Sequence, residues 1–274
     1  MKRLLGLVLL LLPVRLRAAI GNAAFNTLPE ARMDGFRRAL HAADVAWSFR
    51  NLKRKGFAPR LIVDIGAYDG RWTRMIKGVF PESRVFMIDA QSAKQPALEA
   101  VKVQFLGTAD YAISLLAAES GRKIDFQQME SGSSVFAEQS NVPRSTISLD
   151  TRTLDELLTE RDLGGPALLK LDVQGYELEI LKGAAQALSQ AEVVLLETSL
   201  LAYNRDAPQL SDVVRFMDER GFCVYDICSL IRCSHLSLEE LDDTLVHVDL
   251  LFVRKTSSWR PTHFRFHLQT RPEG

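Results

Sequence analysis

The chain has 274 residues, enough for one large α/β domain with an N-terminal extension. Apolar residues make up 47% of it and charged residues 25%, the proportions of an ordinary globular protein with a hydrophobic core. Lysine plus arginine equals aspartate plus glutamate, with 34 of each, so the formal net charge is zero. This balance argues against an enzyme that holds nucleic acid on a broad basic surface.

The first 29 residues form a hydrophobic and basic segment. An apolar run from Leu4 to Leu12 follows two basic residues and is too short to span a bilayer. It is similar to the apolar core of a signal peptide, but no clear small-residue cleavage site follows it. A helix lying on a membrane surface through residues 1–20 is the alternative. Residues 30–56 are then predicted to be helical, with Gly56 as the C-cap.

The most informative stretch is residues 61–70, which reads LIVDIGAYDG. The apolar run predicts a buried parallel strand, Gly66 a sharp turn, and the residues from Arg71 to Val79 a helix. In a doubly wound sheet such a unit places a ligand site at the carboxyl edge. The glycine spacing is not that of a pyrophosphate-binding loop, and Asp64 and Asp69 would repel phosphate.

A ligand with an ammonium and a sulfonium group fits this loop better, which indicates S-adenosylmethionine. The predicted cofactor-binding residues of the loop are Asp64, Gly66, Ala67, Tyr68 and Gly70. The alternative is an ordinary strand, loop and helix with a glycine cap.

A second buried strand is predicted from Arg84 to Asp89. Asp89 follows the glycine turn by about twenty residues, where such folds place a carboxylate on the ribose hydroxyls of the cofactor. The alternative for Asp89 is an N-cap for a helix over residues 93–101. A third strand is predicted over residues 101–106, with Asp110 in the following loop as an acceptor for the adenine amino group or as a turn residue.

Residues 112–150 interrupt the alternation of strands and helices and predict a small antiparallel β insertion beside the site. A buried strand over residues 167–171 then carries Lys170, with Asp172 at its carboxyl end and a helix from Tyr176 to Ala187 after it. Lys170 and Asp172 are two residues apart and so lie on one side of the strand. They form either a structural ion pair or a pair that faces the substrate.

A fifth strand, residues 193–197, ends in Glu197. A helix over 210–220 and strands over 222–228 and 247–254 follow. No full helix separates the last two strands, which predicts a hairpin and hence an antiparallel final strand. The complete prediction is a class I, Rossmann-like α/β fold with a seven-stranded sheet, helices on both faces and residues 256–274 as a tail.

The chain resembles the FkbM family of S-adenosylmethionine-dependent methyltransferases in five places. They are the loop over residues 64–70, Asp89, the K-x-D-x-x-G-x-E stretch from Lys170 to Glu177, the Leu-Lys-Gly-Ala that follows it, and Glu197. The resemblance covers residues 57–255. Gln174 departs from the family pattern, which commonly has an acid there. The resemblance implies O-methylation of a hydroxyl on a sugar or secondary metabolite, so the partner is a small-molecule or glycan acceptor.

For this reaction we assign Asp172 as the leading general base or orienting group, Lys170 as the stabiliser of the developing oxyanion, and Glu197 as the second acid. His247 is a weaker candidate base, and no metal ligand set is predicted. The alternatives are a nicotinamide-dependent oxidoreductase and a non-catalytic binding domain of the same fold. The expected location is the cytoplasm, where this cofactor is made, with peripheral membrane contact as an option. The oligomeric state stays open.

Overall fold

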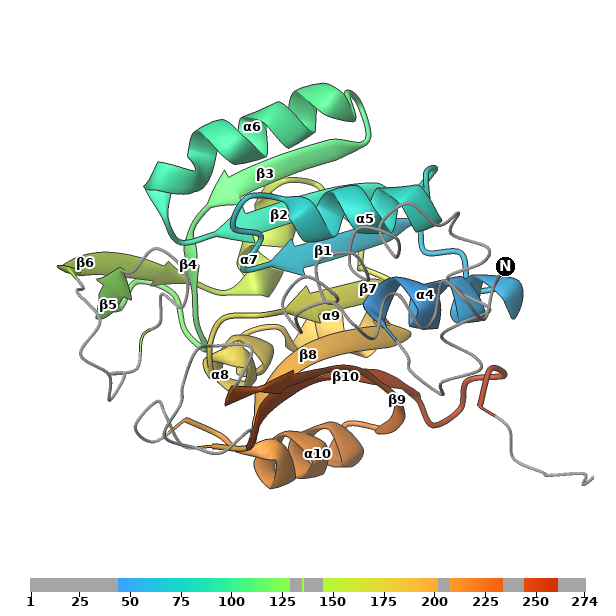
Figure 1. The fold of residues 1–274 in the computed structure, drawn as a ribbon. Coiled ribbons are helices and arrows are strands. Elements are labelled where there is room, and N and C mark those ends of the chain that lie inside the picture. The colour runs from blue at the N-terminus through green and yellow to red at the C-terminus, as the bar shows by residue number, and fades with distance from the viewer. Residues whose placement is uncertain (1–43, 129–134, 136–144, 202–206, 234–243, 261–274) are drawn as a thin grey trace, which may run out of the picture. The chain divides into compact units, whose positions relative to one another are not determined.

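A computed structural model describes residues 44–128, 135, 145–201, 207–233 and 244–260. Its centre is a seven-stranded sheet with the order β3-β2-β1-β7-β8-β10-β9 (Figure 1). The strands are β1 Leu61–Ile65, β2 Arg84–Asp89, β3 Ala109–Ile113, β7 Leu168–Leu171, β8 Val193–Ser199, β9 Phe222–Arg232 and β10 Leu245–Arg254. Strand β10 runs antiparallel to both of its neighbours, whereas β3, β2, β1, β7 and β8 are mutually parallel. The predicted class I fold is therefore confirmed.

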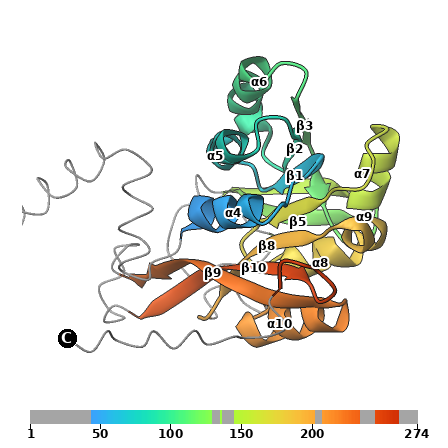
Figure 2. The same ribbon diagram turned by 90° about the vertical axis from the view of Figure 1, so that its right-hand side faces the viewer.

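Helices cover both faces of this sheet (Figure 2). Two separate clusters of buried apolar side chains form the core, and each cluster joins the sheet to a different set of helices. One cluster holds α4 Val45–Arg54, α5 Arg71–Val79 and α6 Gln95–Gln104, and the other holds α7 Leu154–Glu160, α8 Glu177–Lys182, α9 Ala185–Gln190 and α10 Leu210–Glu219. Because both faces are covered, the central strands are mostly apolar, and the charged residues within β1 and β7 are Asp64 and Lys170.

Strand β1 shows how this packing assigns side chains. Val63 and Ile65 belong to the cluster with α7 to α10, whereas Ile62 belongs to the cluster with α4 to α6. Asp64 therefore lies on the α5 side of the sheet, since side chains alternate along a strand. The same alternation in β7 places Lys170 on that side, directly beside Asp64 in the register.

The predicted third strand over residues 101–106 is wrong. Helix α6 continues to Gln104, and the strand begins only at Ala109. The sequence alternates apolar and polar residues here, but Leu98 and Val101 are fully buried while Val103 is 64% exposed. A helix buries Leu98 and Val101 on one side, because residues three apart share a face.

The predicted helix over residues 176–187 is two short helices, α8 and α9. They separate at Gly183, where an added Cβ would lie 2.2 Å from the carbonyl oxygen of Ala117. The chain therefore bends at Gly183 and packs closely against the backbone of Ala117 and Ala118.

The β insertion is confirmed as a three-stranded sheet with the order β4-β6-β5. Its strands are β4 Leu115–Leu116, β5 Lys123–Gln128 and β6 Ser145–Arg152. Strands β5 and β6 are antiparallel as predicted, but β4 pairs with β6 in parallel. Residues 129–134 and 136–144 of the insertion lie outside the described residues.

The predictions for residues 1–29, for most of the helical region before residue 44 and for the tail after residue 260 also lie outside the described residues. The described part of that region is α4, which buries Phe49 and Leu52 against the sheet and is followed by Gly56 at φ 99°. In the described ranges no helix is both long and apolar enough to cross a membrane.

Candidate active site

A cavity of about 270 Å³ opens at the carboxyl edge of the sheet, where β1 meets β2 and β7. Its walls come from the ends of these strands, the segment after β3, the loop after β7 and the β insertion. The volume is close to the lower end of the roughly 300–1,000 Å³ typical of ligand pockets. Strand order reverses between β1 and β7, which is the position where doubly wound sheets bind ligands.

Gly66 brings the ends of β1 and β7 together. Its φ is 73°, and an added Cβ would lie 1.9 Å from the carbonyl oxygen of Asp172. The sequence predicts that Gly66 allows a ligand to approach the backbone. The structure shows that the close neighbour is the backbone of Asp172, so the fold requires a glycine at this position whether or not a ligand is bound.

The predicted loop residues differ in their access to the cavity. Gly66 and Tyr68 line it, and Tyr68 has a positive φ of 52°. Ala67 is buried, and Gly70 is the N-cap of α5 at φ 72°, in contact with the side chain of Val101. The loop therefore presents its backbone and the Tyr68 ring, over which the Lys94 ammonium lies 3.7 Å from the ring centroid.

Asp89 lies at the carboxyl end of β2 and lines the cavity. Its two oxygens accept the backbone N–H groups of Tyr68 and Gln91, each at 2.8 Å. The side chain is only 6% exposed, and burial raises the pKa of its carboxyl despite these two hydrogen bonds. Asp89 is thus held rigidly at the position predicted for it.

Asp64 does not reach the cavity. Its side chain has no exposed surface, because Thr73 donates a hydrogen bond to one oxygen at 2.7 Å and the Lys170 ammonium lies 3.0 Å from the other. The cationic group beside Asp64 is therefore a lysine of the chain itself, and Asp64 does not line the cavity as a cofactor-binding residue would. A ligand cannot contact this carboxylate in the arrangement seen.

Lys170 is enclosed by oxygen atoms. Its Nζ donates to the carbonyl oxygens of Gly66 at 2.9 Å and Ile65 at 3.3 Å, and it lies 3.7 Å from Asp172 Oδ2. Burial by itself lowers the pKa of Lys170, but the carboxylates of Asp64 and Asp172 outweigh burial and raise it. The ammonium is a permanent charge that ties the Gly66 turn to β7, and it does not line the cavity.

Asp172, Gln174 and Glu197 form a chain of polar contacts beside the cavity. The Gln174 amide donates to Asp172 Oδ1 at 3.2 Å and to Glu197 Oε2 at 2.6 Å. His247 Nε2 lies 3.3 Å from Glu197 Oε1. Burial and the neighbouring Asp172 charge raise the pKa of Glu197 well above its usual range, and burial lowers the pKa of His247. Asp172 and Gln174 line the cavity, and Glu197 lies behind them.

Glu177 holds the loop after β7, a role that the sequence analysis missed. Its carboxylate accepts the backbone N–H groups of Val173 at 2.9 Å and Gly175 at 3.2 Å. Burial raises the pKa of Glu177 to about 7. The sequence feature that indicates this role is an acid two residues after Gly175, at the first position of helix α8.

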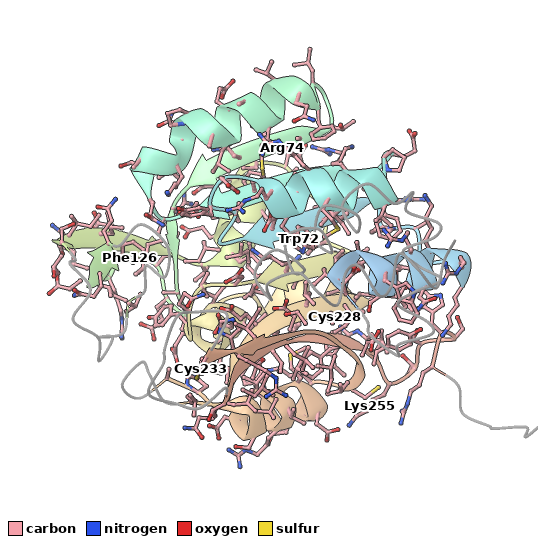
Figure 3. All side chains as sticks on the ribbon, viewed as in Figure 1. Trp72, Arg74, Phe126, Cys228, Cys233 and Lys255 are labelled. Atoms are coloured by element: carbon pink, nitrogen blue, oxygen red, sulfur yellow. The ribbon has the colours of Figure 1, made fainter. Side chains whose placement is uncertain are left out.

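Asp110 lies at the amino ends of the parallel strands, opposite the cavity, so its predicted contact with adenine is wrong. It is near the amino end of β3 and forms ion pairs with Lys102 at 2.9 Å and Arg161 at 3.5 Å. The error follows from the misplaced third strand. The residues that follow β3 in the cavity are Ser114, Leu115 and Leu116, and Phe126 of the insertion (labelled in Figure 3) adds an aromatic wall.

The fold and the site together define an S-adenosylmethionine-dependent methyltransferase of class I. The sheet order with an antiparallel β10, the glycine turn after β1 and the acid after β2 are the features of that class seen here. The family profile of the methyltransferase FkbM domain matches residues 64–224, more than half of the chain. The chain belongs to the FkbM methyltransferase family. This match supports neither the oxidoreductase nor the non-catalytic alternative.

Solved structures similar to this chain are also methyltransferases. FkbM methyltransferase from Methylobacillus flagellatus KT is 17% identical with a TM-score of 0.43, covering 70% of this chain and 43% of its own. Precorrin-6y C5,15-methyltransferase from Geobacter metallireducens GS-15 is 12% identical with a TM-score of 0.42, covering 77% and 86%. The O-methyltransferase NcsB1 of neocarzinostatin biosynthesis is 10% identical with a TM-score of 0.38, covering 71% and 49%.

This chain therefore spans less than half of the length of the first of these structures. A search of curated proteins found no match.

Proposed function

We propose that this methyltransferase transfers the methyl group of S-adenosylmethionine to a hydroxyl oxygen of a small molecule or glycan, such as a sugar or a secondary metabolite. The observation that carries the proposal is the position of Asp172. Its carboxylate lines the cavity at the carboxyl edge and is held between Lys170 and Gln174. A hydroxyl acceptor must lose a proton, and a fixed carboxylate at the site is suited to accept it.

The residues of the cavity fit the cofactor in their chemistry. Asp89 offers carboxylate oxygens for ribose hydroxyls, and Leu115, Phe126 and Ile180 offer apolar surface for the adenine ring. The backbone from Gly66 to Tyr68 lies on the side where the amino-acid end would bind. S-adenosylmethionine supplies a methyl group on a positively charged sulfur, and the carboxylates near the cavity favour that charge.

Asp172 is the residue proposed to touch the acceptor, as a general base or an orienting group. Lys170 acts through Asp172, because its ammonium is already surrounded by four oxygen atoms and does not line the cavity. This replaces the predicted role of Lys170 at the oxyanion. Glu197 lies one contact further back and holds Gln174, which in turn orients Asp172.

Titration calorimetry with S-adenosylhomocysteine tests the cofactor side. Asp89→Asn removes the charge but keeps the shape, and the loss of a charged hydrogen bond predicts an affinity about 10- to 100-fold lower. Asp110→Asn is the matched control, because Asp110 lies at the opposite edge, and its affinity should equal that of the unsubstituted protein. Equal loss in both variants, or binding of NAD in place of the nucleoside, would contradict the assignment.

Transfer of a labelled methyl group to a panel of sugars and hydroxylated metabolites tests the acceptor side. Mass spectrometry should find the label on oxygen. Asp172→Asn should lower the rate about 10²–10⁴-fold while S-adenosylhomocysteine binding stays intact. A nearly unchanged rate in this variant would exclude Asp172 as the base.

A further inference from the structure

The loop from Asp172 to Tyr176 is fixed in an unusual backbone conformation. Gln174 has a φ of 58° and Gly175 a φ of 102°, so the chain makes a left-handed turn at a residue that is not glycine. Such a turn is disfavoured for side chains with a Cβ and persists only where surrounding contacts hold it. Here the Glu177 carboxylate accepts the N–H groups on both sides of Gln174.

This turn directs the Gln174 side chain between two carboxylates. The Nε2 atom lies 2.6 Å from Glu197 Oε2 and 3.2 Å from Asp172 Oδ1. A primary amide has two N–H donors on this one nitrogen, and each is directed at a carboxylate from a different strand. Gln174 thereby joins the carboxyl ends of β7 and β8.

The surroundings explain why a donor is needed here. Asp249 lies directly opposite Glu197 in the pairing of β8 and β10, and burial together with the nearby carboxyl groups of Asp172, Glu177 and Asp249 raises the pKa of Glu197. Lys170 lies close to Asp172 and Asp64, and its carboxylate partners are on β1 and β7. His247 touches Glu197 but is not a standing charge at neutral pH, because burial lowers its pKa.

Divalent cations take carboxylate oxygens as ligands and can therefore hold two carboxylates together. In this chain the amide nitrogen of Gln174 occupies that bridging position. Within the described residues no group of three or more histidine, cysteine or acidic side chains has the arrangement of a metal site. The bridge is therefore made with hydrogen bonds from a neutral group.

We infer that Gln174 is a positioning residue whose side-chain amide stands in place of a cation between Asp172 and Glu197 and fixes the orientation of Asp172. The bridge itself rests on the contacts above. Its consequence for methyl transfer rests on the proposed function, since Asp172 is the proposed contact with the acceptor.

Gln174→Glu tests the bridge, because it keeps the shape, replaces the donor nitrogen with an acceptor oxygen and so adds a third carboxylate. This variant should bind Mn²⁺ at pH 8.5 at least about tenfold more tightly than the unsubstituted protein, as measured by the electron paramagnetic resonance of free Mn²⁺. Gln91→Glu is the matched control, since Gln91 lines the same cavity away from Glu197. It should show no such gain.

Gln174→Leu tests the same bridge by removing the donor without adding charge. The two carboxylates then lose their shared hydrogen bonds, so the carboxyl titration seen by ¹³C NMR in glutamate- and aspartate-labelled protein should move to higher pH. Circular dichroism and binding of S-adenosylhomocysteine verify that the variant is folded.

Two results would overturn the inference. One is a Gln174→Glu protein that binds Mn²⁺ no better than the Gln91→Glu control. The other is an unchanged carboxyl titration in folded Gln174→Leu protein. Failure of the proposed function has a different signature, since it appears as methyl label absent from the acceptor oxygen, and it leaves both of these measurements interpretable.

Discussion

Replacing Lys170 with methionine should leave a buried charge without its partner. The ammonium is 5% exposed and Asp64 is fully buried, so water cannot take the place of the lost contact at 3.0 Å. Removing one member of a buried ion pair typically costs about 3–5 kcal/mol. The carbonyl oxygens of Ile65 and Gly66 also lose a donor, which places the expected loss toward the upper end.

Urea unfolding followed by circular dichroism measures this loss. For a domain of this size, about 3–5 kcal/mol corresponds to a melting temperature roughly 6–20 °C lower. Lys182→Met is the control, because Lys182 pairs with Glu179 on the surface and its ammonium side chain is 50% exposed. A pair of that kind contributes only about 0–1 kcal/mol.

A double variant, Lys170→Met with Asp64→Asn, separates the ion pair from simple loss of packing. It removes both charges, so it should be more stable than Lys170→Met alone. The reasoning is refuted if Lys170→Met costs no more than the Lys182 control, or if the double variant is no more stable than the single one.

Three further variants test the loop after β7, the turn after β1 and the start of α7. Glu177→Gln should flatten the dependence of stability on pH. Burial raises the pKa of Glu177 from 4.5 to about 7, so its contribution to stability is full below pH 4.5 and is lost as pH rises through 7, by at most roughly 3 kcal/mol. Unfolding at pH 5 and at pH 8 measures this loss, with Glu179→Gln as the control. Gly66→Ala should lower the free energy of unfolding by at least about 2 kcal/mol, because the added Cβ meets the backbone of Asp172. Gly56→Ala is the control, because Gly56 has φ 99° and open space around it, and it should lower the free energy of unfolding by only about 1 kcal/mol in the same assay. Thr153→Ala should cost about 1 kcal/mol, since Thr153 caps α7 by accepting the N–H of Glu156, and equal stability of the two proteins would contradict that role.

The positions of the central strands along the chain follow from the sequence because their signal is local. Strands β1, β2, β7 and β8 are short apolar runs, and each is predicted within a few residues. Asp89 lines the cavity for the same reason, since an acid at the end of a buried parallel strand reaches the carboxyl edge of the sheet. The resemblance to the FkbM family rests on such short, contiguous stretches.

The third strand could not be found in this way. Residues 101–106 alternate as a strand does, and only the burial of Leu98 and Val101 against the sheet selects the helix. That error carried Asp110 to the wrong edge, because the residues after a strand are assigned from where the strand ends. Local periodicity cannot decide between two structures when both would bury some of the same side chains.

The role of each acid was decided by tertiary structure alone. Asp64, Asp89 and Asp172 each lie in or directly after a buried strand, yet their surroundings differ. Asp64 is sealed by Lys170, whereas Asp89 and Asp172 line the cavity, Asp89 held by backbone N–H groups and Asp172 beside Lys170 and Gln174. The Gln174 bridge likewise depends on Glu197, which is 23 residues away in the chain. Sequence determines where a carboxylate enters the sheet, but its charge state and its exposure depend on groups that only folding brings within a few ångströms.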